Sequence, residues 1–201
     1  PALPGRHALA TAAWGWLLRP AFAADEDFDR LNIWVPDAPE LSGYLTDVRR
    51  LLTRASDNAL AKGKLPAQHR ALYRQIVFAA GWQESCWRQF VRSGDKLRPL
   101  ASATGDVGLM QVNRNTWRGV YDVQGLSGDI TYNASAGSEI LLYYLSRYAV
   151  RKEEDKQMGG HLARATYSAY NGGPSALGRY RNPRTPAVWK KVDEAFWTKF
   201  Q

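Results

Sequence analysis

The sequence predicts a mainly α-helical domain. Apolar residues recur at helical spacing in several long segments, stretches rich in Gly and Pro separate these segments, and no region is rich in strand patterns. The chain has 201 residues, of which 45% are hydrophobic and 12% aromatic, so it suits one compact unit with a sizeable core. The same composition excludes an intrinsically disordered chain.

Two helices are predicted in the first half of the chain. Apolar residues spaced three and four apart lay one stripe along residues 40–56, and the Lys-Gly-Lys run at 62–64 ends this helix. Pro66 suits the first position of a second helix, whose apolar run indicates a buried core helix. Glu84 lies at the carboxyl end of this second helix.

Further elements are predicted in the second half. Residues 93–108 are rich in Gly, Ser, Asp and Pro, which indicates a loop or a small hairpin. The helical segments after it are residues 114–120, 133–150, 162–170 and 186–200. An Asn-Gly-Gly-Pro run ends the helix over 162–170, since Gly adopts the left-handed conformation of helix ends and Pro prevents continuation.

The N-terminal residues have the pattern of a secretory signal. Arg6 and His7 precede an apolar run over 8–18, which leads to the small residues Ala21 and Ala23. The run is shorter than the roughly 20 residues of a membrane-spanning helix. A buried or amphipathic first helix is the alternative. No other segment has the pattern of a membrane span, so we expect no transmembrane segment in the mature chain.

The net charge of +8, from 27 Lys and Arg against 19 Asp and Glu, predicts a surface that attracts anionic partners. Nucleic acid, a cell-wall polymer and a membrane surface all remain open on charge alone. A solvated basic surface without a dedicated partner is equally compatible with this charge.

Cys86 is the only cysteine, which excludes an intramolecular disulfide and a metal site built on several thiolates. A nucleophilic thiol would need a neighbouring base. His69 lies within a predicted helix and His161 in a loop that contains Gly, so neither is an evident partner. We therefore expect Cys86 to be buried and inert.

Three short blocks follow one another along the chain. They are the pair Glu84-Ser85, a Gly-Leu-Met-Gln block at 108–111 and an Ala-Tyr-Asn-Gly-Gly block at 169–173. Each alone is compatible with a structural role, as a helix end, a turn or a helix cap. In this order and at this spacing they resemble the catalytic set of the lytic transglycosylases, which cleave the glycan strands of bacterial peptidoglycan. The similarity covers about residues 68–180.

The resemblance implies a lysozyme-like helical domain with a small hairpin or loop region and a substrate groove. It implies no metal and no organic cofactor, and peptidoglycan glycan strands as the partner. The parts of the chain are then a signal peptide remnant over 1–23, an N-terminal extension with a helix over 24–66, and a lysozyme-like catalytic domain over 67–201. We expect residues 25–39 to be an extended lead-in to the domain. The expected location is periplasmic or secreted.

Glu84 is the single catalytic acid and base that the resemblance implies. Burial at the end of an apolar helix raises the pKa of a carboxyl group and keeps a proton available near neutral pH. Most glycosidases pair such an acid with a second carboxylate, and these blocks supply no obvious one. In the family the N-acetyl group of the substrate takes its place, and the C6 hydroxyl attacks C1 to form a 1,6-anhydro sugar. The activity implied is that of a lyase.

The resemblance also implies substrate-binding roles for seven other residues. Tyr170 is expected to reach the catalytic carboxyl, and Asn171 to position it or the N-acetyl group. Gln111 is expected to bond the sugar, and Met110 to line the groove by apolar contact. Gly108 is expected to allow close approach of the backbone, and Ser102 to contact the substrate. Ser85 follows the acid, as in the family.

This chain departs from the family pattern at several positions. Asp106 stands where most relatives have a small residue, so an extra negative charge lies near the expected groove with an open role. Trp87 is compatible with sugar stacking and equally with a place in the core. Arg184 begins an Arg-Thr-Pro run where relatives often have an acidic residue before a Thr-Arg pair, which puts one expected substrate contact in doubt.

Three alternatives remain. A hydrolase resembling goose-type lysozyme would carry acids at the positions of Ser102 and Asn113, which here cannot act as bases, so a lyase is favoured. Asp95 or Asp106 could replace those acids if the loop folds inward. A wall-binding protein without turnover would not need the acid at Glu84. Nucleic-acid binding rests on charge and aromatic content without a recognised motif, and we do not expect it.

Overall fold

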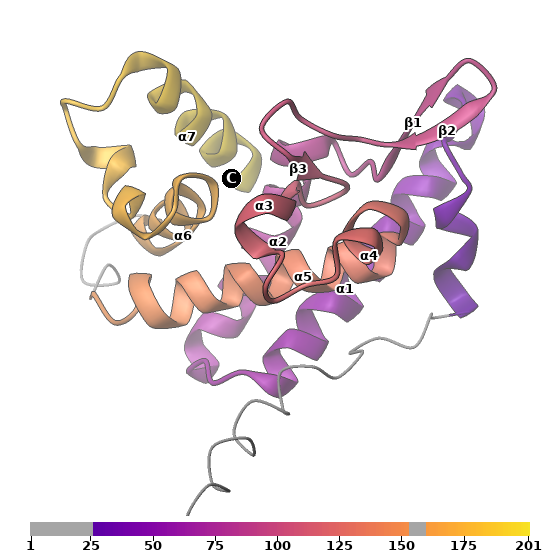
Figure 1. The fold of residues 1–201 in the computed structure, drawn as a ribbon. Coiled ribbons are helices and arrows are strands. Elements are labelled where there is room, and N and C mark those ends of the chain that lie inside the picture. The colour runs from indigo at the N-terminus through magenta and orange to yellow at the C-terminus, as the bar shows by residue number, and fades with distance from the viewer. Residues whose placement is uncertain (1–25, 153–159) are drawn as a thin grey trace, which may run out of the picture.

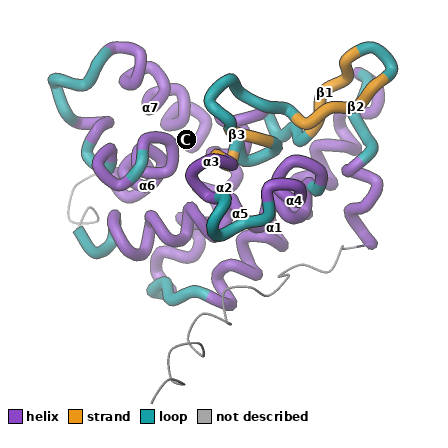
Figure 2. The backbone as a smooth tube through the Cα atoms, viewed as in Figure 1, coloured by secondary structure: helices purple, strands orange, loops and turns teal. Residues whose placement is uncertain are grey.

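The computed structural model describes residues 26–152 and 160–201, and helices dominate this part of the chain, as predicted (Figures 1 and 2). The expected signal segment over 1–23 lies outside the described residues. The α-helices are α1 (Leu41–Lys62), α2 (Arg70–Ser85), α3 (Arg114–Trp117), α4 (Val123–Gly128), α5 (Ile130–Tyr144), α6 (His161–Gly172) and α7 (Ala187–Phe200).

Short turns and two small ribbons complete the architecture. The 3-10 turns are Glu26–Asn32, Ala38–Glu40, Ala67–His69, Pro174–Ala176 and Arg179–Arg181, and a π-helical turn, Leu145–Ala149, continues α5. The predicted hairpin is present as the antiparallel pair β1 (Phe90–Ser93) and β2 (Lys96–Pro99). A second antiparallel pair is β3 (Asp106–Val107) and β4 (Val112–Asn113).

Helix α5 lies at the centre of the fold. It packs against α1, α2, α4 and α6, and α7 closes the other side of α2 (Figure 1). Most of its side chains are buried, including Ile140, Leu141 and Leu142. A helix that is covered on nearly all sides is apolar all round, which explains why its sequence does not present a single narrow stripe.

Residues 26–32 form a 3-10 helix, so the prediction of an extended lead-in is wrong for this part of it. Phe28 and Leu31 are buried in the same hydrophobic core as α1 and α5. The Asn32 side chain also accepts a hydrogen bond from the backbone N–H of Ile130, at the start of α5. This segment therefore helps to build the core. The boundary predicted at residue 66 stays a prediction, although residues on both sides of it share one core.

Side-chain caps set helix starts that the spacing of apolar residues does not predict correctly. The Asp129 carboxylate accepts from the backbone N–H groups of Thr131 and Tyr132, so α5 begins at Ile130 rather than at residue 133. Asp122 caps α4 in the same way, in a segment where the apolar pattern predicts no helix. An aspartate that satisfies free N–H groups sets a helix start independently of the apolar stripe.

Cys86 is exposed, so the prediction of a buried thiol is wrong. It caps the carboxyl end of α2 in the left-handed conformation, with φ of 52°, and Trp87 follows with φ of 60°. The sharp turn ends the helix just after Glu84-Ser85, and it directs the thiol outward. Across residues 26–152 and 160–201, no group of three or more His, Cys, Asp or Glu residues could hold a metal ion.

None of the helices within the described ranges combines the length and apolarity that a membrane span requires.

Candidate active site

Glu84 lies in the last turn of α2, and its side chain is partly buried. The hydroxyl of Tyr167, on α6, donates a hydrogen bond to Glu84 Oε1 at 2.8 Å. The ring of Tyr167 stacks on Phe196 of α7, with centroids 4.1 Å apart and planes 3° apart. Three helices that are distant in sequence thus fix the position of this carboxyl group.

The pKa of Glu84 is raised to about 7. Burial of the carboxyl group is the main cause, because it disfavours the charged form. The hydrogen bond from Tyr167 and the positive charge of Arg179 oppose the rise, and the negative charge of Asp106 adds to it. A substantial share of Glu84 therefore carries a proton at neutral pH, which a general acid requires.

The Gly-Leu-Met-Gln block forms a tight turn between β3 and β4. Gly108 has φ of 75°, and a Cβ there would lie 2.3 Å from Gln89 Oε1 and 2.5 Å from Asn133 Nδ2. Gly108 allows a close approach to its backbone, as expected. In the structure, however, the groups that approach it are two buried side-chain amides. Gln89 and Asn133 were not identified from sequence.

These two amides hold the turn from inside. Gln89 Oε1 accepts from the Leu109 N–H at 2.8 Å, and Asn133 Oδ1 accepts from the Met110 N–H at 2.8 Å. Asn133 also donates to the Val107 carbonyl, at 2.8 Å. Both side chains are fully buried, so each bond replaces water that cannot reach the backbone there. A buried Asn within an apolar helix was the available sequence signal.

Ser85 joins α2 to this turn. Its hydroxyl donates to the Leu109 carbonyl at 2.6 Å and accepts from the Arg88 N–H at 3.0 Å. The side chain is buried. In the structure Ser85 thus holds the helix that carries Glu84 against the turn.

Met110 is expected from the resemblance to line a groove, but its side chain is fully buried. A Cβ added at Gly137 of α5 would lie 2.4 Å from Met110 Cβ, and one at Gly81 of α2 would lie 3.2 Å from its sulfur. The thioether therefore packs between two central helices, both of which present a glycine to it.

Tyr170 does not donate to Glu84, in contrast to the expectation. Its hydroxyl donates to the Met110 carbonyl at 2.6 Å, and Tyr167 supplies the hydrogen bond to the acid. Tyr170 is still close enough that, after burial, the charge of Glu84 raises its pKa. The two tyrosines lie three positions apart, so they share one face of α6 and divide the two tasks.

Gln111 has a positive φ of 47°. Its side-chain amide donates to the Gly108 carbonyl at 2.9 Å and to the Leu100 carbonyl at 3.3 Å. The amide nitrogen is thus engaged by the protein itself.

A model of the Transglycosylase SLT domain matches residues 64–188. The chain belongs to the transglycosylase SLT domain family. This confirms the resemblance drawn from the three blocks, and the lysozyme-like helical fold expected with it. Members of the family are lytic transglycosylases that act on cell-wall peptidoglycan. Neither a curated protein nor a solved structure matches the chain significantly.

In this SLT domain, Asp106 accepts hydrogen bonds from three side chains. Ser102 and Thr104 each donate to Oδ2 at 2.6 Å, and Asn113 donates to Oδ1 at 2.8 Å. Burial alone would raise the pKa of Asp106, but these hydrogen bonds outweigh it and lower the pKa. Ser102 and Asn113, where goose-type lysozymes carry acids, therefore serve a carboxylate that lies between them in sequence.

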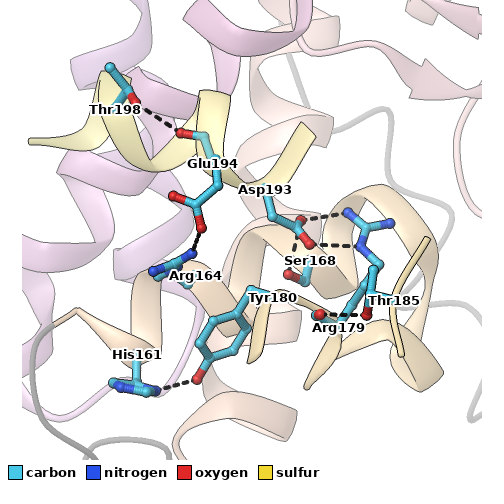
Figure 3. A network of polar contacts seen from close by, with 9 residues as sticks. All are labelled: His161, Arg164, Ser168, Arg179, Tyr180, Thr185, Asp193, Glu194 and Thr198. Atoms are coloured by element: carbon cyan, nitrogen blue, oxygen red, sulfur yellow. Dashed lines mark hydrogen bonds and ion pairs between the residues drawn. The ribbon is translucent and has the colours of Figure 1, made fainter. Parts of the chain in front are cut away.

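Asn171 of the SLT domain is exposed and connects to a buried ion pair. Its Oδ1 accepts from Arg179 Nη1 at 3.0 Å. The same guanidinium donates twice to Asp193 of α7, at 2.9 and 2.6 Å (Figure 3). Ser168 also donates to Asp193, and Thr185 donates to the Arg179 carbonyl (Figure 3). Arg179 thus joins α6 to α7, and its positive charge acts on Glu84. This residue was not identified from sequence.

Two further residues were expected to matter for the substrate. Trp87 packs against the core and donates from Nε1 to the Phe78 carbonyl at 3.0 Å, which favours the core interpretation over a stacking face. Arg184 is exposed next to Thr185, whose hydroxyl supports Arg179.

Proposed function

We propose that this SLT domain cleaves the MurNAc-β-1,4-GlcNAc bond of peptidoglycan and leaves 1,6-anhydro-MurNAc ends. The observation that carries the proposal is the partly buried carboxyl of Glu84, with a pKa raised to about 7 and a hydrogen bond from Tyr167. A group of this kind can donate a proton and take one back near neutral pH. The family match supports the substrate class.

In the first step protonated Glu84 gives its proton to the glycosidic oxygen as the bond to C1 breaks. The departing GlcNAc takes the electron pair and the proton as its 4-hydroxyl. The N-acetyl carbonyl of MurNAc stabilises the positive charge at C1, in the manner of substrate-assisted glycosidases. The Tyr167 hydroxyl stabilises the carboxylate that remains on Glu84, because it donates to Oε1.

In the second step the Glu84 carboxylate takes the proton of the C6 hydroxyl of the same MurNAc. The C6 oxygen bonds to the positive C1, which closes the 1,6-anhydro ring and ends the need for stabilisation by the N-acetyl oxygen. No water is consumed, and Glu84 ends the cycle protonated, as it began.

Asn171 is the proposed contact for the N-acetyl carbonyl. The Arg179 guanidinium can only donate hydrogen bonds, so its partner on Asn171 must be the side-chain oxygen, at 3.0 Å. The amide NH₂ of this exposed residue is then left to donate to a substrate oxygen. Other proposed substrate contacts are Ser102 and Gln111. We propose support of the turn and the acid for Ser85, Gly108, Met110 and Tyr170.

The proposed setting is the periplasm or the cell exterior, where peptidoglycan lies. The net charge of +8 suits an anionic wall polymer. The proposed substrate contacts involve neither a metal nor an organic cofactor.

Mass spectrometry of soluble muropeptides tests the proposal. Purified peptidoglycan is treated with the wild-type chain and with Glu84→Gln in parallel. Anhydromuramyl ends from the wild type alone support the lyase with Glu84 as acid and base. Reducing muramyl ends would identify a muramidase instead, and no release by either chain would favour a wall-binding protein.

A further inference from the structure

Asp106 has no part in the two steps above, yet its charge acts on Glu84. It begins β3, two residues before the glycine of the tight turn. The hydroxyl of Ser85, the neighbour of the acid, donates to the Leu109 carbonyl in that turn at 2.6 Å. The acid and Asp106 therefore lie on two segments that are joined by a direct hydrogen bond.

The surroundings of Asp106 are built to receive a negative charge. Three side-chain donors, from Ser102, Thr104 and Asn113, reach its two oxygens at 2.6 to 2.8 Å. The Asp106 N–H in turn donates to the Ser102 hydroxyl at 3.0 Å, which orients that hydroxyl. Neutral donors of this kind stabilise a carboxylate without cancelling its charge, so the field of Asp106 still acts on its surroundings.

The two carboxyl groups thus have opposite environments. Burial keeps a proton on Glu84, while hydrogen bonds keep Asp106 ionised. Two carboxyl groups whose pKa values are driven apart in this way mark a division of roles in glycosidases, with one group as acid and the other as charge stabiliser or nucleophile. The other groups that act on Glu84 are Tyr167 and Arg179, and both favour its ionised form.

We propose that Asp106 is a second functional carboxylate of this site, which stabilises the positive charge that develops at C1. This inference rests on the proposed function, because it assumes that Glu84 protonates a glycosidic oxygen. Asp106 forms no bond to the sugar in this scheme. The C6 oxygen still closes the ring, and Asp106 contributes its charge while C1 is positive.

Asp106→Asn tests the proposal, with Asp95→Asn as the matched control. Asp95 is exposed in the turn between β1 and β2, so its replacement removes the same charge from the protein without touching this network. The rate of muropeptide release is measured from about pH 2 to pH 9, because the lowered pKa of Asp106 places the acidic limb below the usual range of an aspartate. Asp106→Asn is expected to lower the rate about 100-fold, the scale of a lost electrostatic stabiliser, while Asp95→Asn keeps the wild-type rate.

The pH profile separates this role from a merely structural one. Removal of the negative charge lets Glu84 ionise more easily, so the alkaline limb of the Asp106→Asn profile moves to lower pH. Thr104→Val removes one donor and leaves the charge, so the pKa of Asp106 rises and the acidic limb moves to higher pH. A circular-dichroism melting curve shows whether Asp106→Asn folds. If it does not fold, Thr104→Val tests the proposal instead.

Rates for Asp106→Asn equal to those of Asp95→Asn, or an acidic limb unmoved in Thr104→Val, would overturn the proposal. The chemical nature of the wild-type ends tests the proposed function separately, because the role of Asp106 is judged from the ratio of rates whichever ends are formed. A folded wild-type chain that releases nothing would count against both.

Discussion

Glu84 and Asp193 are both carboxyl groups with restricted access to water, but the protein holds them in different ways. Asp193, only 2% exposed, receives two hydrogen bonds from the Arg179 guanidinium and one from Ser168. Glu84 receives its hydrogen bond from the neutral hydroxyl of Tyr167, and Arg179 acts on it only through its field.

The difference suits the two carboxyl groups to different tasks, Glu84 to the proposed proton transfer and Asp193 to holding the fold. A bidentate guanidinium keeps a buried carboxylate charged and fixed. A neutral donor leaves the cost of burial largely uncompensated, so the pKa rises and the proton becomes available. The same contrast extends to the surroundings, because the turn beside Glu84 is held by the neutral side chains of Ser85, Gln89 and Asn133.

Glu84→Gln removes the carboxyl group that is held by a neutral donor, and it has the largest expected effect. Muropeptide release should fall about 10³-fold or more, the scale of a lost general acid. The same change should stabilise the fold above about pH 7, by about 3–4 kcal/mol, because the raised pKa makes ionised Glu84 costly in the folded state. The wild type should lose this stability as the pH rises from the unfolded-state pKa of a glutamate, about 4.3, through about 7.

Chemical denaturation of both chains at an acidic and an alkaline pH measures this second effect. At acidic pH, where Glu84 is protonated in both states, the two chains should unfold at similar denaturant concentrations. A wild type that is the more stable chain at alkaline pH would contradict the assignment of a raised pKa.

Asp193→Asn removes the charge of the carboxylate that is held by a guanidinium. It leaves the buried Arg179 guanidinium without its charge partner, so the free energy of unfolding should fall by about 3 kcal/mol or more. Glu194→Gln is the matched control on the next residue of α7, because the Arg164–Glu194 pair has a carboxylate that is 58% exposed. That pair should contribute less than about 1 kcal/mol. Equal losses in the two variants, measured by urea unfolding, would contradict a special role for the buried pair.

Gly108→Ala tests the neutral framework beside the acid. The added Cβ would lie 2.3 Å from Gln89 Oε1, and the residue would keep a positive φ of 75°. The free energy of unfolding should fall by about 2–3 kcal/mol, from steric clash and backbone strain together.

Gly94→Ala is the control for this change, since it has φ of 59° and nothing within 4 Å of the added Cβ. It should cost only about 1 kcal/mol, from the left-handed conformation alone. Thermal melts that rank the two variants in the opposite order would show that the amide contacts do not hold the turn.

Tyr167→Phe removes only the hydroxyl that donates to Glu84, and it has the smallest expected effect. The ring keeps its stacking on Phe196, but Glu84 loses the hydrogen bond that lowers its pKa. The alkaline limb of the rate profile should therefore move to higher pH, and the rate should fall by about tenfold, on the scale of one hydrogen bond to a charged group. Tyr170→Phe, which removes a bond to the Met110 carbonyl instead, should leave that limb nearly in place. A larger shift in Tyr170→Phe would reverse the assignment of the two tyrosines.

The helical class, the main helices, the place of Glu84 near the end of α2 and the family could be predicted from the sequence alone. These features follow from short-range patterns. Apolar spacing sets which face of a helix is buried, and motif residues that lie close in sequence stay close in space. The family assignment needed no contact between distant segments, because it rests on the order and spacing of the three blocks along the chain.

Which side chains contact one another depends on the tertiary structure. Tyr167 and Tyr170 share a face of α6, so only the packing of α6 against α2 and the turn shows which hydroxyl reaches Glu84. In the same way the burial of Met110, the exposure of Cys86 and the pairing of Arg179 with Asp193 depend on contacts between separate elements. The physical reason is that periodicity specifies the direction of a side chain on its own element, whereas its partners depend on how the elements pack.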